Sequence, residues 1–160
     1  MEWKNSVTDE SEFKPIPVPL AWDAVGYRDY DGFAWYRTRF DALPVAADES
    51  LTLILGQIDD TDEVFLNGAM IGETGDREKA KRHDETNYYR QWRRYEFSAS
   101  QLEASNVIAV RVFDRGGIGG LYSGPVGIMR SSDYAAYRAM IEESKKRDFG
   151  DVIDWLLGRS

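Results

Sequence analysis

The chain has 160 residues, a net charge of −8 and no cysteine. This length is enough for one compact domain with its own core, and the absence of cysteine excludes disulfides and thiolate metal sites. Acidic and basic residues are interleaved, which argues against a nucleic-acid partner held by phosphate contacts. No apolar run approaches the roughly 18 residues that span a bilayer, so no membrane partner is expected.

The first residues have no basic start followed by an apolar core, so no signal peptide is visible. An extracytoplasmic location, periplasmic or secreted, is favoured only if such a peptide has been removed. The sequence leaves the oligomeric state open.

Short segments rich in β-forming residues follow one another along the first 130 residues. They cover residues 33–40, 51–58, 64–66, 69–71, 92–97, 107–113 and 126–129. In residues 107–113, Ile108, Val110 and Val112 alternate with a second set and share one face. Regularly spaced strands with turn residues between them predict a β-sandwich. Residues 98–102 predict a single helical turn.

Two turn signals bound the third of these segments. Asn67-Gly68 separates two apolar runs and predicts a type I′ hairpin, because that turn needs positive φ at both central residues. At the other end, Asp59, Asp60 and Asp62 are interpreted as turn-capping residues that accept hydrogen bonds from nearby backbone N–H groups. The alternative is a structural calcium ion bound by their oxygens, but the EF-hand glycine and terminal glutamate are missing. No cofactor is therefore predicted.

The last 30 residues have a helical pattern. Ser131 and Ser132 are N-cap candidates, and Tyr134 and Tyr137 begin an apolar stripe that a second stripe follows in residues 149–157. The favoured interpretation is a sandwich of residues 1–130 with the helical segment 131–160 packed on the same domain. The alternative is a docking helix for a catalytic domain or another partner protein.

Catalytic signatures are missing from the sequence. His83 is the sole histidine and lies in the charged stretch 76–85, and there is no Gly-x-Ser-x-Gly nucleophile elbow. No pair of carboxylates has a context that marks it as a glycosidase pair. The glycine-rich stretch 116–120 fails the dinucleotide fingerprint because Tyr122 occupies the place of the third glycine. We therefore expect no enzyme activity from this chain alone.

Four segments occur in an order that resembles a known family. They are residues 56–72, residues 31–37 with Val18-Pro19 and Trp22 before them, residues 94–97, and residues 106–114 running into 116–120 and 124–126. Over residues 13–130 the chain resembles the sugar-binding jelly-roll domain of family 2 glycoside hydrolases and the related insert of sialate O-acetylesterases. The resemblance implies an all-β jelly-roll β-sandwich, galactose-binding-like, with a short helical C-terminal segment. That family's catalytic glutamates lie in a separate barrel domain.

The resemblance also implies where a sugar would bind. The glycine-rich loop would lie at the sugar-facing end of the sandwich with Asp114 before it, and the loop of residues 27–31 would lie beside it. A sugar site needs an aromatic face and fixed polar groups. The candidate ligand-binding residues are Asp29, Tyr30, Asp31, Trp92, Asp114, Arg115 and Tyr122.

For Tyr30 and Tyr122, ligand contact and simple packing are equally favoured. Residues 76–90 would shape the same end or be mobile. Six other aromatic residues are predicted to be core: Trp35, Tyr36, Phe40, Phe65, Tyr95 and Phe113.

The leading functional prediction is a non-catalytic carbohydrate-binding or accessory domain of a glycan-degrading hydrolase. The alternative is a protein-interaction or scaffolding module that has kept the fold without sugar binding. A stand-alone hydrolase is the least favoured. The sequence names neither the sugar nor the parent enzyme.

Overall fold

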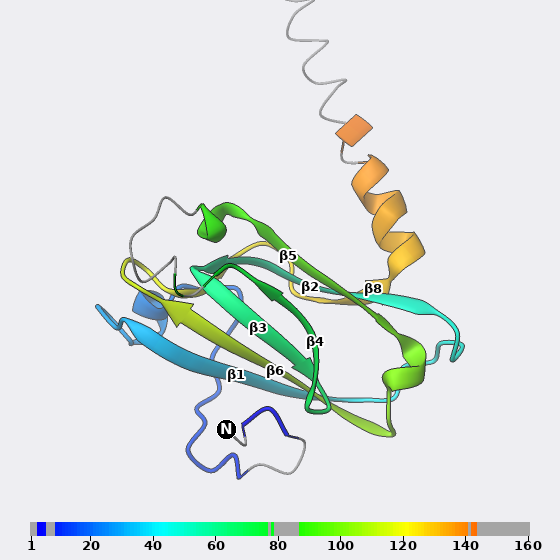
Figure 1. Ribbon diagram of the computed structural model, residues 1–160, viewed down its shortest axis with the longest axis horizontal. Helices are drawn as coiled ribbons and strands as arrows, with labels where there is room; N and C mark the ends of the chain where they lie inside the picture. The colour runs from blue at the N-terminus through cyan, green and yellow to red at the C-terminus, as the bar shows by residue number, and fades with distance from the viewer. Residues whose placement is uncertain (1–2, 6–8, 77, 79–86, 141, 144–160) are drawn as a thin grey trace, which may run out of the picture.

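The computed structural model describes residues 3–5, 9–76, 78, 87–140 and 142–143. The chain folds into two antiparallel β-sheets that face each other (Figure 1). One sheet has the order β1-β6-β3-β4, with bounds Gly32–Asp41, Ser105–Asp114, Thr61–Leu66 and Ala69–Thr74. The other has the order β5-β2-β7 with β8 also on β2, with bounds Trp92–Ser98, Ser50–Asp59, Gly120–Ser123 and Gly127–Arg130. The predicted all-β sandwich is confirmed.

The core lies between the two sheets because each sheet turns an apolar face inward. The central strands β2, β3 and β6 supply most of it. Ile108, Val110 and Val112 all belong to the core cluster, as the alternation in the sequence predicts. Tyr95 is buried in it, and Tyr36 and Phe40 pack against it, which confirms three of the six predicted core aromatics.

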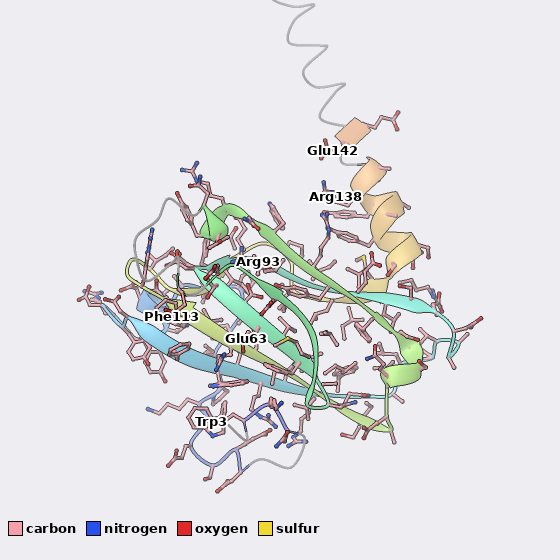
Figure 2. The ribbon with its side chains drawn as sticks, viewed as in Figure 1. Trp3, Glu63, Arg93, Phe113, Arg138 and Glu142 are labelled. Carbon is pink, nitrogen blue, oxygen red and sulfur yellow. The ribbon has the colours of Figure 1, made fainter. Side chains whose placement is uncertain are left out.

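Phe65 is a fourth buried aromatic, at 6% exposure, although it lies outside this cluster. Trp35 and Phe113 are only partly buried, and for these two the prediction is wrong. Trp35, Phe65 and Phe113 alternate with inward-facing neighbours and lie on the outer face of the first sheet. Phe65 packs on Trp35 with ring centroids 5.8 Å apart, and Trp3 meets the other side of Trp35 at 6.2 Å. Figure 2 places Trp3 on the N-terminal segment beside this sheet. An apolar outer face is stable here because the N-terminal segment covers part of it.

The predicted turns form as the local sequence requires. Asn67 and Gly68 have φ values of 49° and 85°, the positive pair of a type I′ turn. The Asn67 carboxamide then joins the hairpin to β6 by accepting a 2.8 Å hydrogen bond from the Val107 N–H. The predicted helical turn is the 3₁₀ helix η3 (Ala99–Gln101), with Ser98 in a capping box. Two further 3₁₀ helices are η1 (Trp22–Val25) and η2 (Tyr88–Arg90).

Strand β7 and the C-terminal helix differ from the predictions or are only partly covered by the described residues. Strand β7 was not predicted; it begins at Gly120, the last residue of the glycine-rich stretch, and its Leu121 pairs with Ile58 of β2. The helix begins at Ser131, and its described part leads away from the sheets with Tyr137 and Met140 exposed (Figure 1). The second stripe, residues 149–157, lies outside the described residues, as does His83. Packing of residues 131–160 on the sandwich therefore stays a prediction.

Among the described residues, no helix is both long enough and apolar enough to cross a membrane.

Candidate functional site

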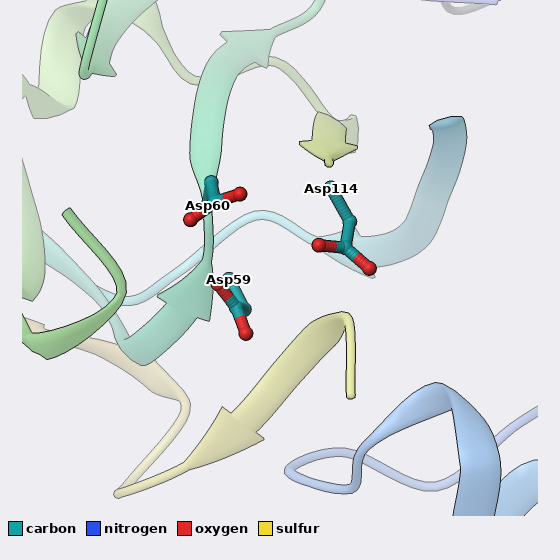
Figure 3. A group of neighbouring side chains, drawn as sticks. All are labelled: Asp59, Asp60 and Asp114. Carbon is teal, nitrogen blue, oxygen red and sulfur yellow. The ribbon is translucent and has the colours of Figure 1, made fainter. Parts of the chain in front are cut away.

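Strands from both sheets begin or end at one end of the sandwich and bring three aspartates together. Strand β2 ends at Asp59, β6 ends at Asp114, and Asp60 stands in the link between the two sheets (Figure 3). Asp59 pairs with Gly120 at the start of β7, and the Asp60 N–H donates to the Phe113 carbonyl at 3.0 Å. One carboxylate oxygen from each of the three residues lies within 4.8 Å of the other two.

Asp114 is fully buried at the base of this end. Its Oδ1 accepts a 2.9 Å hydrogen bond from the Gly116 N–H, while Oδ2 has no hydrogen-bond partner among the described residues. Burial raises the pKa of Asp114 to about 6; the Gly116 N–H opposes that rise, and the neighbouring carboxylates of Asp60 and Asp31 add to it.

Asp59 and Asp60 come next to each other in sequence but differ in environment. Asp60 is buried, and its Oδ2 accepts from the Arg115 N–H at 3.2 Å, with the Arg115 Nε at 3.5 Å. Asp59 is partly exposed. Burial, followed by a hydrogen bond and like-charge repulsion from Asp60, raises the pKa of Asp59 to about 7. The end of the sandwich therefore holds carboxyl groups that resist full ionisation.

The glycine-rich loop is fitted closely over Trp22. Gly119 has a φ of 53°, and a Cβ placed there would lie 2.2 Å from the Trp22 ring and 2.8 Å from the Asp114 Oδ2. The Trp22 Nε1–H donates to the Tyr36 hydroxyl at 2.6 Å, which fixes the ring under the loop. Glycine is therefore required at 119 both for the backbone angle and for the close approach.

Five of the seven predicted ligand-binding residues gather at this end. Asp31 is exposed, and its Oδ1 lies near Gly116. Arg115 follows Asp114 and contacts Asp60. Tyr30 is 44% exposed, donates its hydroxyl to the Phe33 carbonyl and meets the Trp22 ring edge-on. Asp29 lies in the same loop, exposed, with its N–H on the Asp23 carboxylate at 3.3 Å.

The remaining two, Tyr122 and Trp92, lie along the second sheet. The Tyr122 hydroxyl donates to the Tyr89 carbonyl at 2.6 Å. Burial raises its pKa, and the nearby Asp59 carboxylate adds to that rise. Trp92 is 49% exposed on β5, where its ring covers Gly124. Tyr122 is thus near the aspartates, whereas Trp92 lies beyond them against a different loop.

Asp62 does not cap the predicted acidic turn. It points into the sandwich, where its Oδ1 accepts from the Arg93 Nε at 2.7 Å and its Oδ2 accepts from the Tyr95 hydroxyl. Asp60 likewise binds Arg115 of a distant strand end instead of its own turn. The turn-capping interpretation is therefore wrong for both residues. Asp60 lies beside Asp114, and Asp62 is paired with Arg93. The sequence analysis linked neither Asp114 nor Arg93 to this segment.

An aromatic cavity opens beside β1, next to the loop of Tyr30. Its volume is about 790 Å³, and its lining includes Tyr27, Tyr30, Trp22 and Trp35. This volume is in the range of small-molecule sites. The aromatic walls give it surfaces of the kind that the C–H faces of a sugar can pack against.

The fold and this end of the sandwich define a class: an all-β accessory domain of the kind that glycosidases carry. The profile of the family described as "Beta-galactosidase second all-beta domain" matches residues 2–117. The chain belongs to this family of all-β domains of glycoside hydrolase family 2. No curated protein matches the chain.

Solved structures share the fold at low sequence identity. A β-glycosidase from Bacteroides vulgatus has a TM-score of 0.60 at 20% identity, over 81% of this chain and 18% of that one. A β-glucuronidase from Bacteroides uniformis has a TM-score of 0.53 at 20% identity, over 77% of this chain and 14% of that one. A β-glucuronidase from Bifidobacterium dentium, complexed with coumarin-3-O-glucuronide, has a TM-score of 0.50 at 23% identity, over 70% of this chain and 16% of that one. This chain thus spans under a fifth of each neighbour's length.

Proposed function

We propose that this chain is a non-catalytic accessory domain of a glycan-degrading hydrolase, and that it binds carbohydrate where residues 27–32 meet residues 114–122. The observation that carries the proposal is the exposure of Tyr27 and Tyr30 at the rim of the aromatic cavity, at 42% and 44%. Exposed rings beside fixed charged groups are the combination that sugar recognition uses.

Because Asp114 is buried, we assign it a structural role and assign sugar binding to its exposed neighbours. Asp114 has no exposed surface, so it holds the glycine loop through the Gly116 N–H and does not contact the sugar itself. The exposed Asp31 and the partly exposed Arg115 would bind sugar hydroxyls in its place. A shallow site of this kind gives dissociation constants of roughly 0.1–1 mM, since little surface is buried and hydroxyls exchange water for protein.

An NMR titration of the full chain tests the binding. The glycan panel includes plant, microbial and sialylated glycans, and glucuronides because two of the structural neighbours are β-glucuronidases. Amide signals of residues 27–32 and 115–118 should shift with one member of the panel, and Tyr30→Ala should weaken its binding. Tyr137→Ala is the matched control, because Tyr137 is 43% exposed on the distant helix. If no member shifts these signals, the domain does not bind carbohydrate there.

The non-catalytic part of the proposal is supported by the absence of a recognisable nucleophile and base in the sequence. The purified chain should not hydrolyse nitrophenyl glycosides or acetyl esters. Turnover that follows the protein through purification and is lost when one of its carboxylates is changed would overturn this part.

A second candidate, a protein-interaction module, is supported by the apolar side chains that the described residues expose. Exposed apolar side chains are available on the sandwich at Trp92 and Ile118, and on the helix at Met140. Binding of a family 2 catalytic domain that Met140→Ser weakens, without any glycan shift, would favour this candidate.

A further inference from the structure

We propose that Asp59, Asp60 and Asp114 form a calcium site that ties together the ends of β2 and β6 and the glycine-rich loop. This inference does not depend on carbohydrate binding. It differs from the calcium alternative considered for the sequence, because Asp114 takes the place of Asp62 and Asp62 is paired with Arg93.

The geometry fits the size of the ion. Two oxygens bound to calcium at 2.3–2.6 Å can lie at most about 4.6–5.2 Å apart. The three carboxylates each offer an oxygen within 4.8 Å of the others, and Figure 3 shows them converging from two strand ends and a link. Carboxylate oxygens are hard ligands, which calcium prefers. Asp59 is partly exposed, so water can complete the coordination shell.

The second and independent observation is the buried Asp114 Oδ2. It has no hydrogen-bond partner among the described residues, although the Asp114 side chain has no exposure to water. A buried carboxylate oxygen without a partner is strongly destabilising, because it loses its water and gains nothing in exchange. A cation held by the Asp114 carboxylate together with Asp59 and Asp60 would give this buried group a partner.

The balance of charge at this end of the sandwich also favours a bound cation. Arg115 lies 3.5 Å from the Asp60 carboxylate, which is long for a hydrogen bond, and one guanidinium does not balance three carboxylates. Arg93 donates to the Asp60 carbonyl, but its charge is paired with Asp62. Burial is the first cause of the raised pKa values of Asp59 and Asp114, about 7 and about 6, and repulsion from the neighbouring carboxylates adds to it. Either protons or a cation must relieve this repulsion.

Calcium titration of the full chain distinguishes a bound cation from bound protons. The protein is first freed of metal with a chelator. At pH 8 we expect saturable heat by calorimetry at one site, and a melting temperature higher by about 5–10 °C at a hundredfold excess over the dissociation constant. Terbium bound in place of calcium should luminesce when the protein's aromatic residues are excited, because the Trp22 ring lies against Gly119 beside Asp114. Calcium should displace it.

Variants locate the site. Asp114→Asn keeps an oxygen for the Gly116 N–H and removes the charge, so it should fold, melt no lower than the metal-free parent at pH 8, and no longer respond to calcium. Asp59→Asn is the second variant should the first fail to fold. Asp48→Asn, at an exposed acidic position, should respond as the parent does. Calcium affinity should also fall between pH 8 and pH 6, because protons compete for the carboxylates.

Three results would overturn the proposal. In the first, calcium leaves both the heat signal and the melting temperature of the parent unchanged, and the cluster then holds a proton instead. In the second, magnesium binds and calcium does not. In the third, Asp114→Asn and Asp59→Asn respond to calcium as strongly as Asp48→Asn, which would place the ion elsewhere.

Discussion

Replacement of Arg93 by methionine should be the most damaging single change to this sandwich. Arg93 comes from β5, is almost fully buried, and crosses to Asp62 on the opposite sheet (Figure 2). Its Nη2 also donates to the carbonyls of Ile58 and Asp60 at 2.9 and 2.6 Å. One side chain thus joins both sheets and the link that carries the acidic cluster.

The expected loss is about 3–5 kcal/mol, because removing one partner leaves the other charge buried and unpaired. That is a large share of the roughly 5–15 kcal/mol by which a domain is usually stable. Burial already raises the pKa of Asp62, against the opposing effects of Arg93 and Tyr95. Without Arg93 this pKa should rise further, so the deficit should be largest at high pH and shrink as Asp62 takes up a proton in acid.

Urea unfolding followed by tryptophan fluorescence measures the effect. With a slope of about 1–3 kcal/mol per molar urea, the midpoint should fall by roughly 1–5 M. The double variant Arg93→Met with Asp62→Leu should recover part of the loss, since no charge remains buried, although the carbonyls of Ile58 and Asp60 still lack their donor. The reasoning is refuted if Arg93→Met costs under about 1 kcal/mol at pH 8, or if the double variant is no more stable than the single one.

Three further predictions concern stability. Gly68→Val should cost about 1 kcal/mol or more by urea unfolding, because φ at this turn is 85°. Gly127→Ala should be nearly neutral, since no atom lies within 4 Å of the new Cβ, and equal losses at the two glycines would contradict the turn argument. Trp35→Ala should leave a folded domain, because this ring lies on the outer face. A variant without any cooperative unfolding transition would contradict this prediction. In chelator, stability should fall as the pH rises from about 5 to about 8, because the folded-state pKa values of Asp114 and Asp59 are raised. Asp114→Asn should flatten that slope of the urea midpoint against pH, and an unchanged slope would remove Asp114 from the explanation.

The sequence was most informative where a few adjacent residues decide the structure. Asn67-Gly68 forces its own turn through backbone angles, and the alternation of Ile108, Val110 and Val112 selects the face of β6 that enters the core. Both signals are local, so they are readable without knowing what lies opposite. Alternation does not say which face of a strand is covered, however, and Trp35 and Phe113 on the outer face of the first sheet were therefore wrongly predicted to be core.

The acidic end of the sandwich depended on contacts that no local pattern encodes. Strand β7 is only four residues long and follows the glycine-rich loop, and it becomes a strand because β2 offers backbone partners beside it. Asp59 and Asp114 are 55 residues apart in the sequence and meet only because β2 and β6, which belong to different sheets, end at the same end of the sandwich. Asp62, three residues beyond Asp59, turns the other way to Arg93. The sequence by itself determined most of the strands, the Asn67-Gly68 turn and the family. The packing of the two sheets decided which charges are buried together, because burial and pairing are properties of the assembled sandwich.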